Sequence, residues 1–195
     1  KSFDKIIKYI AIVIVPIGLI LFLKQMYLLD YGLKKSIVIK KAEEVDERFH
    51  SRLNCKRKTY RYIINNSPYG TAIYRYLETH IPQKLNVEKM KKAVKYFIGE
   101  HDFKAFKASG TSSKSSVRTI YDAKIYQNGD KIYIELTGNG FLYNMVRIIA
   151  GTLVEVGLEK IEPEKIEEII KEGKRENAGK TLPPNGLYLV DVKYE

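Results

Sequence analysis

The stretch VRTIYDAKIYQNGDKIYIELT, residues 117–137, decides the fold class of this chain. Its two halves, residues 117–126 and 131–137, are rich in the aromatic and β-branched residues that are typical of strands. Between them Asn128 and Gly129 form a pair that readily adopts the positive φ angles of a tight turn. The stretch therefore predicts an antiparallel hairpin.

Upstream of the hairpin, residues 57–65 (RKTYRYIIN) predict a further strand, with Tyr60, Tyr62 and Ile64 on one side. Residues 87–98 carry apolar side chains at helical spacing. Asn86 is suited to begin that helix and Gly99 to end it in the left-handed conformation.

Downstream of the hairpin, residues 141–156 are apolar around most of a helical circumference, which predicts a helix buried inside the domain. Residues 163–171 predict another helix, beginning at Pro163, and residues 187–194 predict a closing strand. Strands and helices in this arrangement indicate an α+β domain with a mainly antiparallel sheet and packed helices.

The composition favours a polyanionic partner. The 195 residues include 34 Lys and Arg against 23 Asp and Glu, a net charge of +11, which suits nucleic acid or an anionic membrane. The one cysteine, Cys55, cannot form an internal disulfide, and the three histidines lie far apart. We therefore expect a reducing compartment and no structural metal site.

The first 33 residues differ from the rest. Residues 9–23 (YIAIVIVPIGLILFL) are uncharged and lie between Lys8 and Lys24. An apolar run of this kind is a little short for a bilayer, but flanking lysines can extend its reach. We expect residues 1–33 to be an apolar helix, either a membrane helix or an unrelated leader. A second domain then follows, from Lys34 to Glu195.

Positive charge is concentrated in two clusters that contain no acid. In the first cluster, tyrosines alternate with cations, a pattern that suits phosphate contact with base stacking, although a solvated strand face has the same pattern. The second surrounds the loop SGTSSKSS, which either closes over RNA or is merely flexible. The first cluster consists of Arg52, Lys56, Arg57, Lys58 and Arg61, and the second of Lys104, Lys107, Lys114 and Arg118.

Arg147 stands in the most apolar predicted helix, between Val146 and Ile148. A buried guanidinium requires an ion pair or a ligand. Helical spacing offers no acid at positions 143, 144, 150 or 151. Its partner is therefore a distant glutamate, a catalytic carboxylate or an RNA phosphate, unless the helix end returns it to solvent.

Five blocks in order resemble the tRNA pseudouridine synthase A family over about 160 residues. They are FHSRLNCKRKTYRYIINN, FIGEHDFKAF, SSVRTIYDAKI, GNGFLYNMVRIIAGTLVEVG and AGKTLPPNGLYLVDVKY. The resemblance implies an isomerase that detaches uracil from its ribose and rejoins it through carbon, at positions 38 to 40 of the tRNA anticodon arm. It also implies a flipped target nucleotide, no cofactor, a homodimer and a cytoplasmic location.

By the same resemblance, Tyr60 stacks on the flipped base, Arg147 pairs with the catalytic aspartate, and Leu187 packs on the pocket. The family's nucleophile lies in a block reading GRTDAGVHA, and this sequence contains no such block. Asp30 lacks the required context. We therefore expect a truncated synthase that is inactive alone. The alternatives are a non-catalytic tRNA-binding module, tethered to a membrane or free, and an enzyme completed by a second chain.

Overall fold

The computed structural model describes residues 41–42, 44–110 and 115–194. From His50 onward they form one compact unit with its own core. The predicted apolar helix, the predicted boundary at Lys34, and both Asp30 and Lys114 lie outside the described residues. No helix in the described part of the chain is long and apolar enough to cross a bilayer.

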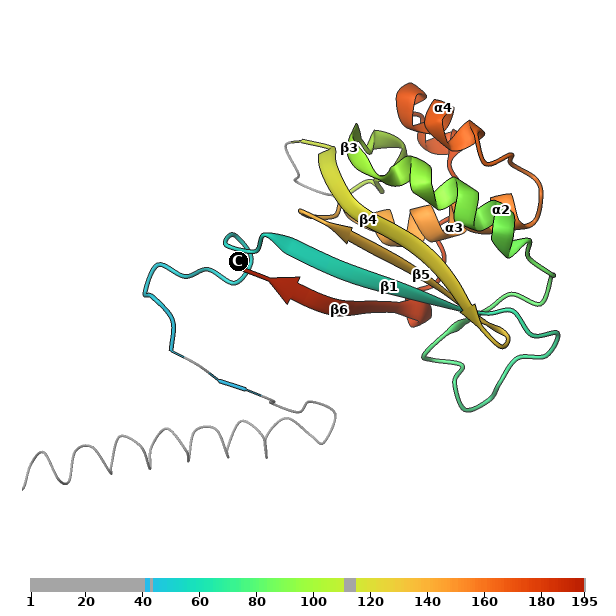
Figure 1. The fold of residues 1–195 in the computed structure, drawn as a ribbon, viewed down its shortest axis with the longest axis horizontal. Coiled ribbons are helices and arrows are strands. Elements are labelled where there is room, and N and C mark those ends of the chain that lie inside the picture. Colours follow the sequence, from blue (N-terminus) through green and yellow to red (C-terminus); the bar gives the residue numbers. More distant parts are fainter. Residues whose placement is uncertain (1–40, 43, 111–114, 195) are drawn as a thin grey trace, which may run out of the picture. The chain divides into compact units, whose positions relative to one another are not determined.

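A mixed sheet forms the backbone of this unit (Figure 1). Its strand order is β2-β1-β5-β4-β3, and β6 also pairs with β1. All pairs are antiparallel except the short parallel pair of β1 with β2. The strands are β1 (Arg57–Asn65), β2 (Thr79–His80), β3 (Gly99–Asp102), β4 (Val117–Asn128), β5 (Lys131–Gly138) and β6 (Leu187–Lys193).

The predicted hairpin is confirmed as β4 and β5. Asn128 pairs with Lys131, and Gly129 takes a φ of +58° in the turn, where a residue without a Cβ is favoured. The first strand runs two residues further than predicted, so the turn itself is only Gly129 and Asp130. This tight connection fixes the register of the two longest neighbours in the sheet.

Three helices cover one face of the sheet (Figure 1). They are α2 (Val87–Val94), α3 (Met145–Gly157) and α4 (Lys165–Glu172), and α2 continues as a 3₁₀ turn over Lys95–Phe97. The alternating residues Ile132, Ile134 and Leu136 of β5 are fully buried beneath them. The sequence prediction of an α+β class is thus correct, and within the described ranges no helix covers the other face of the sheet.

The helix ends differ in part from their predicted positions. Asn86 caps α2 as predicted, accepting a hydrogen bond from the Lys89 amide at 3.1 Å. Gly99, with a φ of +116°, begins β3 and does not end a helix. The helix predicted from residue 141 begins only at Met145, because Asn144 is left-handed with a φ of +59°. That conformation cannot continue an α-helix.

Candidate active site

Helix α3 is the most deeply buried element of the structure. Eleven of its thirteen residues are buried, and the two exceptions are Arg147 and Glu155. Glu155 forms an ion pair with Lys160 at 3.1 Å. Arg147 is therefore the feature of this helix that core packing does not explain.

A close backbone contact holds the segment after Ala178 against α3. A Cβ on Gly151 would lie 1.9 Å from the Lys180 carbonyl oxygen, and one on Gly179 would lie 2.6 Å from backbone atoms of Gly151 and Thr152. The Thr152 hydroxyl accepts a hydrogen bond from the Gly179 amide at 2.9 Å. Both glycines are needed for this approach, which brings Leu182 beside Arg147.

Two neutral acceptors orient the Arg147 guanidinium. Its Nε donates to the Leu182 carbonyl at 2.6 Å, and its Nη1 donates to Oδ1 of Asn144 at 2.8 Å. The left-handed backbone of Asn144 supports this contact from just before the helix. In the described part of the chain Arg147 forms no ion pair, which agrees with the lack of an acid at helical spacing. The two acceptors fix the direction of the guanidinium, and no acid of the described residues neutralises its charge.

Tyr62 connects this arginine segment to the sheet. The side chain is fully buried, and its hydroxyl donates to the Pro183 carbonyl at 2.6 Å and binds the Thr79 hydroxyl at 2.6 Å. Burial raises the pKa of Tyr62 to about 12, against the opposing effects of the Thr79 hydrogen bond and the nearby Arg147 cation. The hydroxyl therefore stays protonated and holds the chain at Pro183 in place.

Tyr60 and Leu187 lie on the same face of the sheet as Tyr62. Tyr60 is half-buried two residues before Tyr62, and its ring meets Phe141 edge to face with 5.2 Å between centroids. Leu187 pairs with Tyr62 across β1 and β6 and packs against the core. The fold thus brings Tyr60, Arg147 and Leu187 to the helix-covered side of β1 and β6. Their roles remain predictions.

The first basic cluster divides between two faces of the sheet. Arg61 points away from the helices, where its Nε donates to Glu135 at 2.7 Å and its charge lies 5.9 Å from the Tyr133 ring. The hydrogen bond that Arg61 donates to Glu135 raises the pKa of Arg61 above its ordinary value. Arg57 lies over the Tyr121 ring at 4.8 Å. The exposed members of this cluster are Arg52, Lys56 and Arg57.

The second basic cluster lies next to the start of α3. The Ala108 amide, one residue after Lys107, donates to the Tyr143 carbonyl at 3.2 Å. Lys104 is exposed, and Arg118 lies on β4 and donates to the Ser115 carbonyl at 3.0 Å. Lys107 is therefore the member of this cluster nearest in the chain to the contact with the α3 N-terminus.

Two positioning groups were not predicted from the sequence. Tyr62 was assigned only to a strand, and Asn144 was placed inside a helix. Nothing in the sequence distinguishes Tyr62 from Tyr60, because both are tyrosines on the same side of one predicted strand. Asn144 could have been recognised as a break before the helix, because asparagine tolerates the left-handed conformation better than most residues do.

Comparison with known proteins gives a consistent result. The family model of tRNA pseudouridine synthase matches residues 93–195. The chain is 49% identical over 168 residues to tRNA pseudouridine synthase A of Acetivibrio thermocellus, covering 86% of this chain and 69% of that protein. It is 51% identical over 172 residues to tRNA pseudouridine synthase A of Ruminiclostridium cellulolyticum, covering 88% and 70%. The Bacillus licheniformis protein of the same name is 44% identical, with the same coverage.

Proposed function

The chain belongs to the tRNA pseudouridine synthase family, and from this premise we propose that it binds tRNA and forms one side of a uridine isomerisation pocket. The observation that carries the proposal is Arg147, a guanidinium fixed by two neutral acceptors with no acid partner in the described residues. A cation held in this way is suited to an anion that comes from elsewhere.

In this proposal each of the three pocket residues has a distinct task. Arg147 holds the catalytic carboxylate in its ionised form, ready to react with the uridine ring or ribose. Tyr60 offers its ring to the flipped base, and its edge contact with Phe141 sets the angle of that ring. Leu187 closes the apolar side of the pocket. The base then leaves the ribose, rotates and is rejoined through carbon.

In this proposal the carboxylate is supplied by another chain. No aspartate of the described residues contacts Arg147, and the sequence has no block like GRTDAGVHA. We propose that the chain alone binds tRNA without isomerising it. The alternative, a non-catalytic tRNA-binding module, is favoured by the same missing block together with the two basic clusters.

Two further features of the proposal concern assembly. Dimer formation, implied by the family resemblance, is expected to bring two clusters of positive charge to one tRNA. Sedimentation velocity measures the oligomeric state directly.

Membrane contact through residues 9–23 is tested by flotation of the full chain with anionic vesicles. If the chain stayed in the bottom fraction while the vesicles floated, that contact would be contradicted.

The deciding experiment measures tRNA binding and pseudouridine formation in one sample of the purified chain. Substitution of Lys56, Arg57 and Lys58 by alanine is expected to weaken binding and to lower its salt dependence, by about one phosphate contact for each effective charge. The control removes three lysines that pair with glutamates on their own helices, Lys91, Lys165 and Lys171. Equal affinity in both triple variants would contradict specific binding by the cluster.

The same sample separates the functional alternatives. Binding without pseudouridine supports a site that needs an external carboxylate, and adding a family member's aspartate-bearing N-terminal portion is then expected to produce activity. Binding that stays inactive after this addition supports the non-catalytic module. Pseudouridine formation by the chain alone would show that a carboxylate of this chain serves as nucleophile, and Asp30→Asn would be the first variant to test.

A further inference from the structure

The connection between β1 and β2 is rich in exposed apolar side chains. Of the fifteen large apolar side chains exposed in the described residues, five lie in this one loop, residues 66–78, which we name the tyrosine loop. Monomeric proteins rarely gather exposed apolar groups without an interaction to explain them. The five are Tyr69 (85% exposed), Ile73 (82%), Tyr74 (44%), Tyr76 (70%) and Leu77 (50%).

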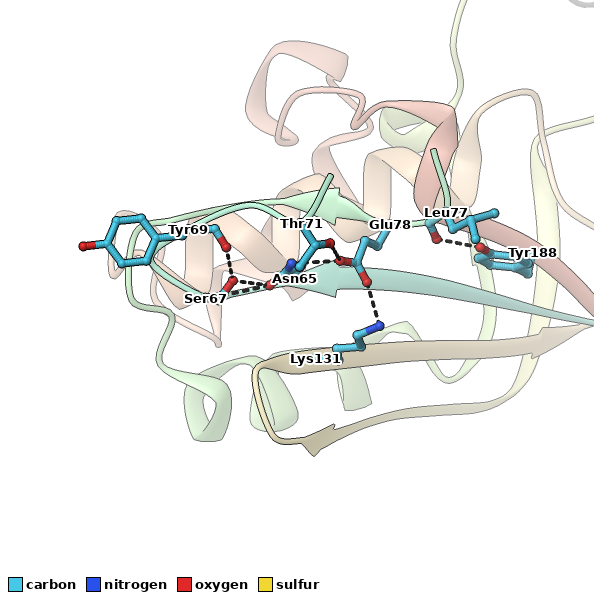
Figure 2. Close-up of polar contacts among 8 residues, drawn as sticks. All are labelled: Asn65, Ser67, Tyr69, Thr71, Leu77, Glu78, Lys131 and Tyr188. Carbon is cyan, nitrogen blue, oxygen red and sulfur yellow. Dashed lines mark hydrogen bonds and ion pairs between the residues drawn. The ribbon is translucent and has the colours of Figure 1, made fainter. Parts of the chain in front are cut away.

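A buried carboxylate holds the tyrosine loop in place (Figure 2). Glu78 is only 5% exposed and accepts hydrogen bonds from the Asn65 amide at 2.8 Å and the Thr71 hydroxyl at 3.0 Å. Its second oxygen pairs with Lys131 at 2.9 Å. Burial acts to raise the pKa of Glu78, but these hydrogen bonds outweigh it and the pKa lies below its ordinary value. These contacts of Glu78 therefore hold the backbone of the loop in one conformation, with its apolar side chains exposed.

The end of the tyrosine loop is tied to the segment that carries the proposed pocket. The Tyr188 hydroxyl donates to the Leu77 carbonyl at 2.6 Å, and the Asn185 amide donates to the Arg75 carbonyl at 3.1 Å (Figure 2 shows the first of these). Asn185 and Tyr188 flank Leu187 in the chain. Tyr188 pairs with Arg61 and therefore faces the helix-free side of the sheet, so these two contacts tie the loop to the edge of β6 at the turn that precedes Leu187 and not to the Leu187 side chain.

The charge of the tyrosine loop suits a nucleic acid better than a second copy of the chain. The loop has one exposed cation, Arg75, whose guanidinium lies 4.5 Å from the centre of the Tyr76 ring. Its one acid, Glu78, is buried and paired. A second copy would bring another Arg75 and another net charge of +11 to the same surface. RNA instead supplies phosphates and bases that stack on tyrosine and arginine.

We propose that the tyrosine loop is a stacking platform for the unpaired nucleotides beside the target uridine, with Tyr76 as its stacking ring and Arg75 as its phosphate contact. This inference rests on the proposed function and extends it to a surface outside Tyr60, Arg147 and Leu187. It assigns the loop a share of the recognition of single-stranded RNA. Nucleotides of a continuous duplex would gain nothing from it, because their bases remain stacked on each other.

The test uses the full chain, an unmodified tRNA transcript and its anticodon stem-loop carrying 2-aminopurine beside the target uridine. Tyr76→Ala is expected to weaken binding of both RNAs roughly ten-fold and to abolish the quenching of 2-aminopurine that stacking produces. Tyr76→Phe keeps the ring and is expected to stay within about two-fold of the parent chain. Arg75→Ala is expected to reduce the salt dependence by about one contact.

The controls distinguish failure of this inference from failure of the proposed function. If the Lys56, Arg57 and Lys58 variant loses tRNA affinity while Tyr76→Ala does not, the platform is refuted and tRNA binding stands. If the parent chain binds neither RNA, both fall. If Ile73→Ala and Tyr76→Ala dissociate an oligomer in sedimentation velocity and leave tRNA affinity unchanged, the loop is a protein interface and the platform is overturned.

Discussion

Arg61 and Arg147 lie on opposite faces of the same sheet and have opposite electrostatic environments. Arg61 is one of two cations on Glu135, whose other oxygen accepts from Lys124 at 3.1 Å, and Tyr126 donates to the same carboxylate at 3.0 Å. Among the residues that the structure describes, Arg147 is held only by a carbonyl and a side-chain amide. On the helix-free face Glu135 neutralises the charge of Arg61. On the helix-covered face no acid of the described residues neutralises the charge of Arg147.

This difference separates two residues that the sequence pattern treats alike. Both arginines stand among apolar or aromatic neighbours, and both were predicted to serve the RNA site. The carboxylate partner of Arg61 comes from β5, 74 residues further along the chain, so no local spacing reveals it. A paired arginine contributes to the stability of the fold, and an arginine with neutral partners only is available for chemistry.

The strongest way to break the comparison is to remove each guanidinium in turn. Arg147→Ala is expected to lower pseudouridine formation by on the order of 10²–10³-fold in an active sample, because the carboxylate loses its fixed counter-charge. Arg147→Lys is not expected to restore activity, since an ammonium cannot reproduce both oriented hydrogen bonds. Single-turnover pseudouridine formation with the aspartate-bearing portion added is the measurement.

The matched control for that prediction is Arg61→Ala. It is expected to lower the urea midpoint of unfolding while changing the single-turnover rate less than a few-fold, because its partner Glu135 lies on the other face. Arg147→Ala should show the reverse, a small change in the urea midpoint and a large loss of rate. Comparable rate losses in the two variants would remove the distinction between a paired and an available arginine.

Acid should weaken the helix-free face first. Burial acts to raise the pKa of Glu135, but hydrogen bonds from Arg61, Lys124 and Tyr126 outweigh it, so the pKa lies below its ordinary value of 4.5. A carboxyl with a lowered folded pKa contributes stability that is present above the unfolded pKa and is lost as pH falls through the folded pKa. We expect the free energy of unfolding to be level near neutral pH and to fall below about pH 4.5.

Glu135→Gln sharpens this prediction. The variant is expected to be about 1–3 kcal/mol less stable than the parent at pH 7, because two cations lose their anion, and to converge toward the parent as the pH falls. Glu100→Gln, at an exposed position of β3, is the control and is expected to run parallel to the parent. Urea titrations between pH 3 and 7 measure all three. A constant difference between Glu135→Gln and the parent would refute the linkage.

More of the fold than of the candidate site could be predicted from the sequence. A period-two pattern located β1, runs of aromatic and β-branched residues located β4 and β5, and the Asn128-Gly129 pair located the hairpin, because local steric preferences act within a few residues. The two short strands were missed, since β2 has two residues and β3 has four and neither can show a period. Boundaries depended on single backbone conformations, as the late start of α3 at Met145 shows.

The site could be predicted from sequence only where one residue's own neighbours were informative. Arg147 was found because its apolar surroundings and the lack of a nearby acid are local facts. The Leu182 carbonyl and the Tyr62 contact with Pro183 could not be found, because they depend on the close approach of Gly151 and Gly179 over 28 residues of chain. The ion pair of Arg61 with Glu135 could not be predicted either, because its two residues are 74 positions apart in the chain.

The smallest expected effect concerns Asn144, one of the two acceptors that orient Arg147. Asn144→Gly removes the acceptor of Arg147 Nη1 but suits the φ of +59°, so we expect unchanged stability and a loss of single-turnover rate of a few-fold. Asn144→Ala removes the same acceptor and adds about 1 kcal/mol of left-handed strain, so it should lose the same rate and also stability. Rates and urea midpoints of both variants test this. If only Asn144→Ala lost rate, the backbone conformation and not the side-chain amide would be orienting Arg147, and the amide would have no part in aiming the guanidinium.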